Sequence, residues 1–229
     1  MEFFQAAFRS AWDLLLSGDP ALWGIVLTSL RISLAAVAVS ALVAVPLGAW
    51  IGIRAFPGRR LLRQILASLT ALPTVVVGLL LYGLLSRRGP LGDWGLLYTQ
   101  AAVILGEAVL ILPLLLHWVS TAVLDADPRL LPTLEALGAG IGHRLRYVVS
   151  EQRAAVAAAL VTAFGRAIGE VGVAMMLGGN IAGYTRTMTT AIALETSKGE
   201  FELGLALGTI LLVVAFTVNG ILAWLQTRE

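Results

Sequence analysis

Five apolar stretches, each long enough to cross a bilayer as a helix, dominate this chain. They cover roughly 22–53, 65–86, 97–120, 154–178 and 203–225. A spanning helix needs about 20 consecutive apolar residues, and only helices and closed barrels satisfy the backbone polar groups in lipid. The 229 residues are 58% hydrophobic and 13% charged, whereas a soluble domain carries about 25% charged residues. The sequence therefore predicts an all-α membrane bundle of five transmembrane helices, forming a single domain over 1–229.

Residues 1–19 differ from these stretches because their apolar side chains gather on one helical face. Phe8 and Trp12 lie on that face, and Arg9 and Asp13 lie on the opposite one. A helix with this pattern lies in the plane of the membrane interface and does not span it. Packing of the apolar face against the bundle is the alternative. We predict an N-terminal interfacial helix in contact with lipid.

Composition excludes several classes of site. The chain has no cysteine, so it has neither a disulfide framework nor a thiol nucleophile. Its two histidines, His117 and His143, do not have metal-ligand spacing, and we predict no metal site. A net charge of +2 is too small to indicate a nucleic-acid partner.

The distribution of basic residues predicts the orientation in the membrane. Nine Lys and Arg residues lie in the segments 54–64 and 121–153 and at Arg228, against five on the opposite side. Short cytoplasmic loops carry the excess of Lys and Arg in membrane proteins. We therefore expect these segments and the C-terminus in the cytoplasm, and the N-terminus outside, in the cytoplasmic membrane.

The segment 121–153 is the longest polar stretch and is predicted to dock a partner. Asp127-Pro128 and Leu131-Pro132 are helix-start signals, and glycines at 138 and 140 end a short helix. A second, partly apolar helix follows. An ordinary connector is the alternative, but long loops in compact domains usually have a role. The predicted docking residues are Thr133, Leu134, Glu135, Ala136, Leu137, Gly138, Ala139 and Gly140.

A pair of charges lies inside the fourth apolar stretch. Arg166 and Glu170 are four residues apart, so on a helix they can neutralise each other. Charges at membrane depth usually face a bundle interior or a water-filled path. Gly165 and Gly169 form a G-x-x-x-G pair, which permits close helix packing. A structural ion pair is one interpretation; the other is a translocation path or dimer interface where Arg166 transiently compensates a passing dianion.

The fourth stretch breaks at Gly178-Gly179-Asn180 and continues into an external segment, 180–202. Its side chains include Asn180, Thr185, Arg186 and Thr187. Hydroxyl, amide and guanidinium groups suit a tetrahedral oxyanion, and they equally suit a loop that receives another protein, which we favour.

One further charge lies at membrane depth. Glu107 falls within the third apolar stretch. It pairs with Arg31 of the first stretch if the two helices bring the side chains together.

Two motifs resemble those of a known family. The turn Leu137-Gly138-Ala139-Gly140, followed by Val148-Val149, is similar to the "EAA" loop of permeases of binding-protein-dependent ABC importers. In that family the short helix is a coupling helix that inserts into a groove of the ATP-binding subunit. The sequence from Arg166 through Gly172, and the segments Gly179–Ile181 and Thr185–Ile192, resemble the molybdate, tungstate and sulfate branch. The continuation from Leu194 to Leu203 resembles tungstate permeases most.

The resemblance implies a permease of the type I ABC importer fold that moves an oxyanion, tungstate in the first place and molybdate in the second, with sulfate as a further substrate of the branch. It implies a homodimer with two ABC ATPase subunits and an external oxyanion-binding protein. No Walker A sequence occurs here, so ATP and Mg are expected on the ATPase, and this chain is expected to be neither an enzyme nor a cofactor carrier.

Three other classes of protein remain to be weighed. A secondary transporter for a small anion usually has two related halves, and no clear internal repeat is present. A channel has no need of a docking loop. An intramembrane enzyme is the third, but no H-E-x-x-H motif and no paired carboxylates stand out.

Overall fold

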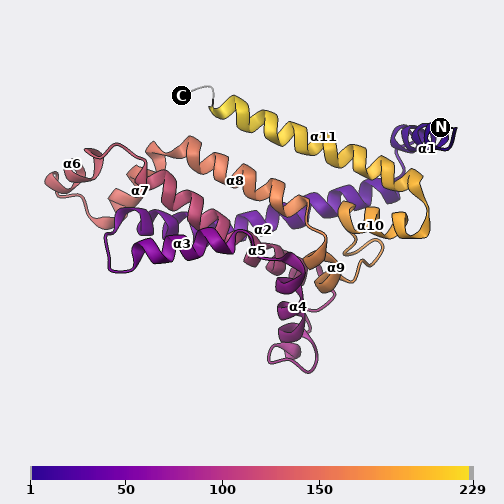
Figure 1. Ribbon diagram of the computed structural model, residues 1–229, viewed down its shortest axis with the longest axis horizontal. Coiled ribbons are helices and arrows are strands. Elements are labelled where there is room, and N and C mark those ends of the chain that lie inside the picture. The colour runs from indigo at the N-terminus through magenta and orange to yellow at the C-terminus, as the bar shows by residue number, and fades with distance from the viewer. Residues whose placement is uncertain (1, 227–229) are drawn as a thin grey trace. The chain divides into compact units, whose positions relative to one another are not determined.

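The computed structural model describes residues 2–226, which are helical through most of their length and contain no strand (Figure 1). The elements, in order, are α1 (Glu2–Leu16), α2 (Pro20–Ile53), α3 (Arg59–Leu69), α4 (Thr74–Leu85), the 3₁₀ turn η1 (Gly92–Trp94), α5 (Gln100–Leu124), α6 (Leu130–Ala136), α7 (Ile141–Glu151), α8 (Arg153–Ile168), α9 (Gly172–Gly178), α10 (Met188–Lys198) and α11 (Phe201–Gln226). The prediction of an all-α chain is confirmed over this range. Arg228, which entered the orientation count, lies outside the described residues.

Three of these helices are long and apolar enough to cross a membrane. They are α2, α5 and the Phe201–Ile221 part of α11. Two broken pairs, α3 with α4 and α8 with α9, raise the number to as many as five if each pair counts as one span. The chain is therefore a multi-pass membrane protein.

The second predicted span is not one helix. Helix α3 begins at Arg59, within the segment that we predicted to be a loop, and it ends at Leu69. Pro73 then precedes α4 in an extended conformation, with ψ of 117°. Proline disfavours helical geometry in the residue before it, so an uninterrupted helix over 65–86 is disfavoured although the apolar run is continuous.

The fourth predicted span is broken as well. The sequence predicted one helix to Gly178, but α8 ends at Ile168 and α9 starts at Gly172. The Glu170 carboxylate accepts a hydrogen bond from the Val173 backbone N–H at 3.1 Å. A helix start has four N–H groups without helical partners, so this bond stabilises the new start at the break. The predicted break after Gly178 is confirmed, with Gly179 at a φ of +68°.

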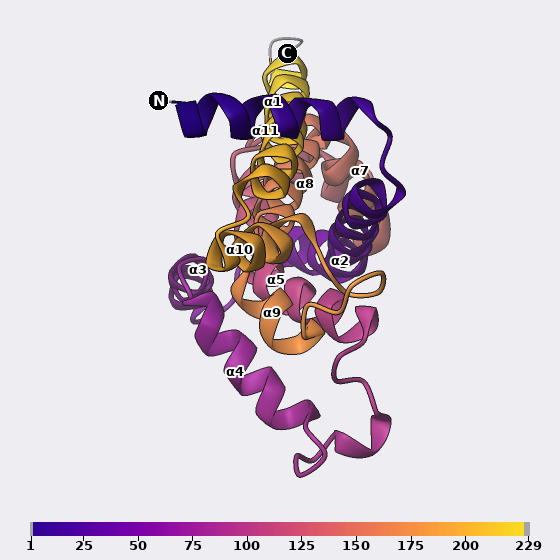
Figure 2. The ribbon, with the colours of Figure 1, turned by 90° about the vertical axis from the view of Figure 1, so that its right-hand side faces the viewer.

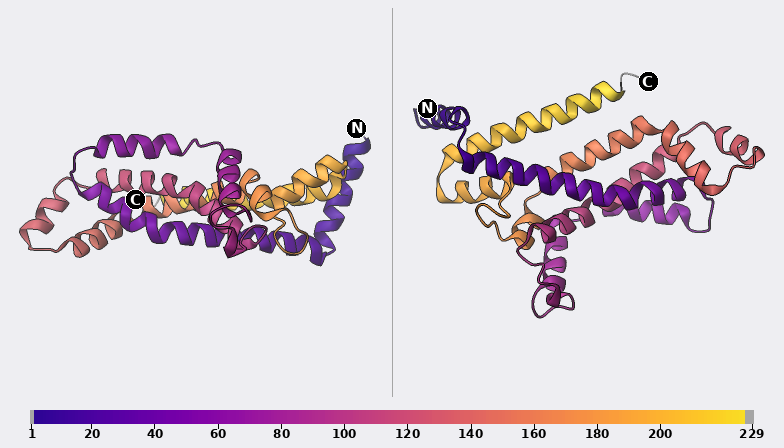
Figure 3. Two further views of the ribbon diagram at one scale, coloured as in Figure 1. Left: turned by 90° about the horizontal axis from the view of Figure 1, so that it is seen from below. Right: turned by 180° about the vertical axis from the view of Figure 1, so that it is seen from behind.

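The chain forms two compact units. The first comprises Met1–Ala36, Pro73–Glu107 and Gly165–Val218, and the second comprises Val37–Leu72, Ala108–Phe164 and Asn219–Glu229. In the first unit α4 packs against α9, and the loop between α9 and α10 reaches toward α2 (Figure 2). In the second unit α3 lies along α2 and α5 (Figure 3). There Arg59 Nη2 donates to the Gly52 carbonyl at 2.8 Å, and Arg63 Nη2 donates to Thr121 Oγ1 at 3.1 Å.

Within the first unit, α5 and α9 lie close together at Gly106. A Cβ atom placed there would lie 2.4 Å from Val173 Cγ1 and 2.5 Å from Leu177 Cδ1. We expect Gly106→Ala to lower the free energy of unfolding by about 1–3 kcal/mol, the usual cost of overpacking. Unfolding by SDS in mixed micelles measures it. Gly83→Ala in α4 is the matched control, since nothing lies within 4 Å of its Cβ position; equal stability of the two variants would contradict this contact.

Candidate functional site

The docking segment folds as two helices joined by a glycine turn, as predicted. Helix α6 ends at Ala136, and Gly138 follows at a φ of +71°. The Ala139 N–H donates to the Leu134 carbonyl at 2.9 Å, which closes the turn. Gly140, in an extended conformation, directly precedes α7. The chain therefore reverses within a few residues and presents the turn at the end of the helix pair.

Arg144 of α7 joins the two sides of this turn. Its Nη1 pairs with Glu135 of α6, and its Nε donates to the Ala139 carbonyl at 2.7 Å. A guanidinium has five donors in a fixed planar fork, so one side chain fixes both the α6 helix and the turn. This role was not predicted from the sequence, because a pair nine residues apart across a turn has no spacing signal.

A hollow opens between the turn and α7. It has a volume of about 730 Å³ and is lined by Leu134, Leu137, Gly138, Ala139, Gly140, His143, Arg146, Tyr147 and Ser150. Leu137 is 78% exposed and Tyr147 is 51% exposed. Large apolar side chains beside a concave surface, rimmed by polar groups, mark an interaction site. We call this surface the α6–α7 hollow.

The turn requires glycine at position 138. Its Cβ position is open, with nothing within 4 Å, but the φ is positive, and a left-handed conformation costs a residue with a Cβ about 1–2 kcal/mol. We expect Gly138→Ala to lower the melting temperature of the purified chain. Gly142→Ala is the matched control: that position in α7 is also open, and alanine favours a helix over glycine by about 1 kcal/mol. A Gly138→Ala variant as stable as Gly142→Ala would exclude strain at the turn.

The predicted pair inside the fourth span forms across the helix break. Arg166 Nη1 lies 2.9 Å from Glu170 Oε2, and the two side chains are 34% and 2% exposed. The backbone carbonyl of Glu170 also accepts a hydrogen bond from Thr189 Oγ1 at 2.6 Å. Glu170 therefore joins α8, α9 and α10 through its carboxylate and its carbonyl group. This confirms the ion-pair prediction, although Glu170 lies beyond the end of the helix that carries Arg166.

Two other expectations about membrane-depth residues had different outcomes. Gly165 and Gly169 are both exposed in the chain, so the surface that they form beside the end of α8 is open to contact by another helix. The pairing of Glu107 with Arg31, which depended on the two helices bringing the side chains together, is not formed among the described residues. Glu107 is buried beside Ser33, whereas Arg31 is exposed and makes no ion pair with the described residues.

The external segment contains a helix that was not predicted from the sequence. Its polar composition indicated a loop over 180–202, but α10 occupies Met188–Lys198. The Thr187 hydroxyl accepts from the Thr190 N–H, and the Thr190 hydroxyl in turn accepts from the Thr187 N–H. This reciprocal cap starts the helix. The Met188 N–H donates to Ser29 Oγ at 2.7 Å, which ties the start of α10 to α2.

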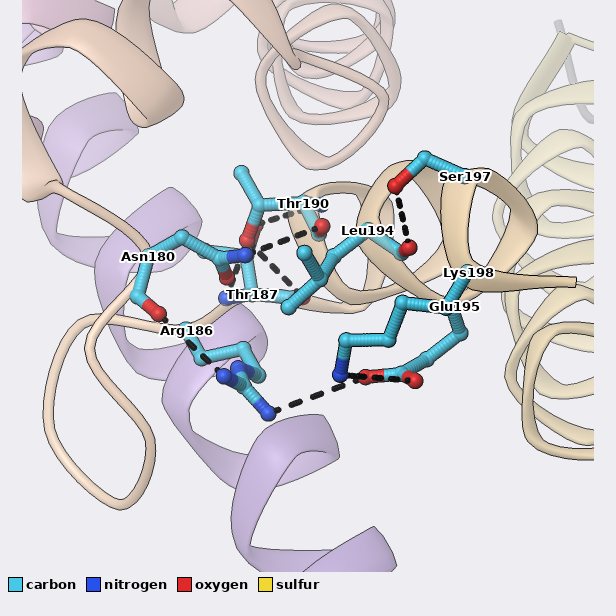
Figure 4. Close-up of polar contacts among 8 residues, drawn as sticks. All are labelled: Asn180, Arg186, Thr187, Thr190, Leu194, Glu195, Ser197 and Lys198. Carbon is cyan, nitrogen blue, oxygen red and sulfur yellow. Dashed lines mark hydrogen bonds and ion pairs between the residues drawn. The ribbon is translucent and has the colours of Figure 1, made fainter. Parts of the chain in front are cut away.

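The predicted oxyanion groups of this segment are mostly used within it (Figure 4). Thr185 is buried and donates to the Gly178 carbonyl at 2.6 Å. Asn180 Nδ2 donates to the Thr190 carbonyl at 3.3 Å. Arg186 differs, because its nearest carboxylate, Glu195, lies 3.9 Å away and is also bound by Lys198 at 3.2 Å. Arg186, the one charged side chain among the predicted external residues, thus shares its carboxylate partner with Lys198.

The geometry is that of a multi-pass membrane bundle with two broken helix pairs and a two-helix segment joined by a glycine turn. No family model matches the chain, but curated relatives do. It is 40% identical over 226 residues to the tungstate uptake system permease protein TupB of Peptoclostridium acidaminophilum, covering 99% of each chain. It is 41% identical to TupB of Campylobacter jejuni over 164 residues, covering 72% of this chain and 69% of that one.

A more distant relative extends the same group. The chain is 33% identical over 193 residues to the molybdenum transport system permease protein ModB of Escherichia coli (strain K12), covering 78% of this chain and 82% of the relative. The chain therefore belongs to the permease subunits of binding-protein-dependent ABC importers, in the branch of tungstate, molybdate and sulfate permeases. This confirms the family that the motifs of the sequence resemble.

Proposed function

We propose that this chain is the permease subunit of an importer that carries tungstate across the cytoplasmic membrane. The observation that carries the proposal is 40% identity to a tungstate permease over 99% of both chains. Molybdate is the second candidate, because tungstate and molybdate are dianions of nearly the same size and shape. The chain has no ATP-binding motif, so it carries no cofactor and performs no hydrolysis; ATP and Mg bind to a separate ABC ATPase.

Two ATPase subunits dock at the α6–α7 hollow, one on each permease copy. Exposed Leu137 and the concave surface beside it support this proposal. The Arg144 bridge across the turn supports it too, since a rigid turn transmits a movement of the ATPase to the helices. The docking residues Thr133 to Gly140 thus couple ATP hydrolysis to transport.

The permease is a homodimer of the type I importer fold, with five spans in each copy. Counting α3 with α4 and α8 with α9 as spans gives this number. The exposed Gly165 and Gly169 permit close backbone approach by a second copy. Arg166 and Glu170 lie at the same break, so the dimer contact and the translocation path adjoin one another. Helix α1 lies in the membrane interface, with Phe8 and Trp12 exposed toward lipid.

The segment after Gly179 faces outward and receives an oxyanion-binding protein. The N-terminus is outside and the C-terminus is in the cytoplasm, as the distribution of Lys and Arg favours. Ile181 and Tyr184 are exposed beside Asn180 and Arg186, which gives this surface the aromatic and polar character of protein interfaces. Selection of the anion belongs to the binding protein.

Uptake by the reconstituted importer tests the proposal. The permease, its co-purified ATPase and the binding protein are placed in proteoliposomes, and tungsten, molybdenum and sulfur are measured after addition of equimolar tungstate, molybdate and sulfate. We expect ATP-dependent accumulation of tungstate above the other two. Preferential accumulation of sulfate would contradict tungstate as the transported anion. A permease that co-purifies with no ATPase would indicate a channel or a secondary transporter.

A further inference from the structure

A second hollow lies in the first unit, between α2 and the α9–α10 loop. Its volume is about 350 Å³, and it is lined by Pro20, Ala21, Gly24, Ile25, Leu27, Thr28, Arg31, Ala182, Gly183 and Arg186. The hollow contains two guanidinium groups from segments far apart in the sequence, and none of its lining residues is acidic. We call it the Arg31–Arg186 pocket.

Arg31 is a cation without an internal partner. It is exposed, lies within the apolar helix α2, and makes no hydrogen bond or ion pair with the described residues. A charge on a spanning helix costs free energy unless it faces a bundle interior or a water-filled path. Thr28, one helical turn earlier, lies on the same face and also lines the pocket. This face of α2 is therefore suited to a polar occupant.

Arg186 reaches the pocket from the other side with unused donor capacity. Its Nη2 contact to the Asn180 carbonyl is long at 3.4 Å. Glu195 does not neutralise it fully, since Lys198 binds both Glu195 oxygens at 3.2 Å. In Figure 4 the Arg186 guanidinium and the Lys198 ammonium both point toward this one carboxylate. The four charges Arg31, Arg186, Lys198 and Glu195 leave a net charge of +2.

We propose that the Arg31–Arg186 pocket binds a tetrahedral oxyanion dianion. Two guanidinium groups match the charge of the dianion, and each can form paired N–H···O bonds to its oxygens. The inference rests on the proposed function and adds to it a site on the permease itself, apart from Arg166 and the binding protein. The site is open, and a conducting site must bind weakly enough to release its ion; the pocket thus serves to receive the anion and pass it on.

Arg31→Gln is the decisive variant, because the Arg31 side chain makes no hydrogen bond or ion pair with the described residues whose loss would disturb the fold. The readout is the shift in melting temperature of the purified permease–ATPase complex on addition of sodium tungstate, without binding protein, against sodium chloride of equal ionic strength. We expect wild type to shift and Arg31→Gln to need about tenfold more tungstate for the same shift, as expected when a contact of about 1.4 kcal/mol is lost. Arg31→Lys restores part of the response. Arg88→Gln, which removes an exposed arginine outside the pocket, leaves it unchanged.

Uptake in proteoliposomes separates this inference from the proposed function. If the pocket receives the anion, Arg31→Gln slows tungstate uptake about tenfold at saturating binding protein while ATP hydrolysis stays at the wild-type rate. If wild type takes up tungstate and Arg31→Gln matches Arg88→Gln in both assays, the pocket is not a binding site and the inference fails. If the wild-type importer takes up no oxyanion at all, the proposed function itself fails.

Discussion

Arg166→Gln should be the most destabilising single substitution at the helix break. It leaves the Glu170 carboxylate, which is 2% exposed, without its countercharge. Removing one partner of a buried pair usually costs about 3–5 kcal/mol. Because Arg166 is itself 34% exposed, we expect a loss of about 2–4 kcal/mol in the free energy of unfolding. SDS-induced unfolding of the permease in mixed micelles measures it.

The reverse substitution is the matched control. Glu170→Gln keeps an oxygen that can accept the Val173 N–H bond. The residue left without its countercharge is then Arg166, which still reaches solvent. We therefore expect a cost well below that of Arg166→Gln, and we expect Arg166→Gln combined with Glu170→Gln to recover part of the stability. A larger loss for Glu170→Gln than for Arg166→Gln would contradict the argument that an uncompensated Glu170 carboxylate carries the cost.

The same double variant distinguishes the two interpretations of Arg166. It removes the pair without leaving a buried charge, so the permease can assemble with its ATPase. If Arg166 only neutralises Glu170, tungstate uptake by the assembled double variant stays near the wild-type rate. If Arg166 also compensates a passing dianion, uptake falls by at least about tenfold, the effect of losing one contact of about 1.4 kcal/mol.

Much of the helix pattern could be predicted from the sequence, because length and hydropathy act over whole segments. Helices α2, α5 and α11 lie within a few residues of the predicted apolar stretches. The breaks before Pro73 and after Ile168 were not predicted, since each lies inside a segment that is long and apolar enough as a whole to span the membrane. A break depends on whether the freed backbone groups find partners, and the Val173 N–H finds one in Glu170. That partner cannot be read from an apolar run.

In the candidate sites, too, features with a local sequence signal could be predicted, whereas those that depend on tertiary contacts could not. The glycine turn at Gly138 was predictable because a positive φ strongly favours glycine. The Arg144 bridge to Glu135 was not, since it depends on how α6 and α7 fold back on each other. Helix α10 was missed because a threonine-rich segment indicates a loop, although the cap between Thr187 and Thr190 is a local signal. The Arg31–Arg186 pocket joins segments about 150 residues apart (31 to 186), and no sequence spacing indicates it.

Leu137→Ala should uncouple the permease from its ATPase without unfolding it. Leu137 is 78% exposed at the rim of the α6–α7 hollow, so its side chain contributes little to the fold of the isolated chain. An apolar side chain that anchors an interface contributes 2 kcal/mol or more, so we expect about 30-fold weaker binding of the ATPase. Affinity of the detergent-solubilised permease for the purified ATPase measures it, and ATP-dependent uptake of tungstate should fall in parallel.

Leu61→Ala provides the matched control, because Leu61 of α3 is also an exposed leucine, at 62%, and it lies outside the hollow. Both truncations remove the same three side-chain carbons from an exposed position, so a general effect of losing apolar surface would appear equally in the two variants. Only Leu137→Ala should weaken the ATPase complex, while both variants keep the wild-type melting temperature. Equal ATPase affinity for the two variants would place the docking surface elsewhere, whereas a loss confined to Leu137→Ala would locate the coupling of ATP hydrolysis to transport at the α6–α7 turn.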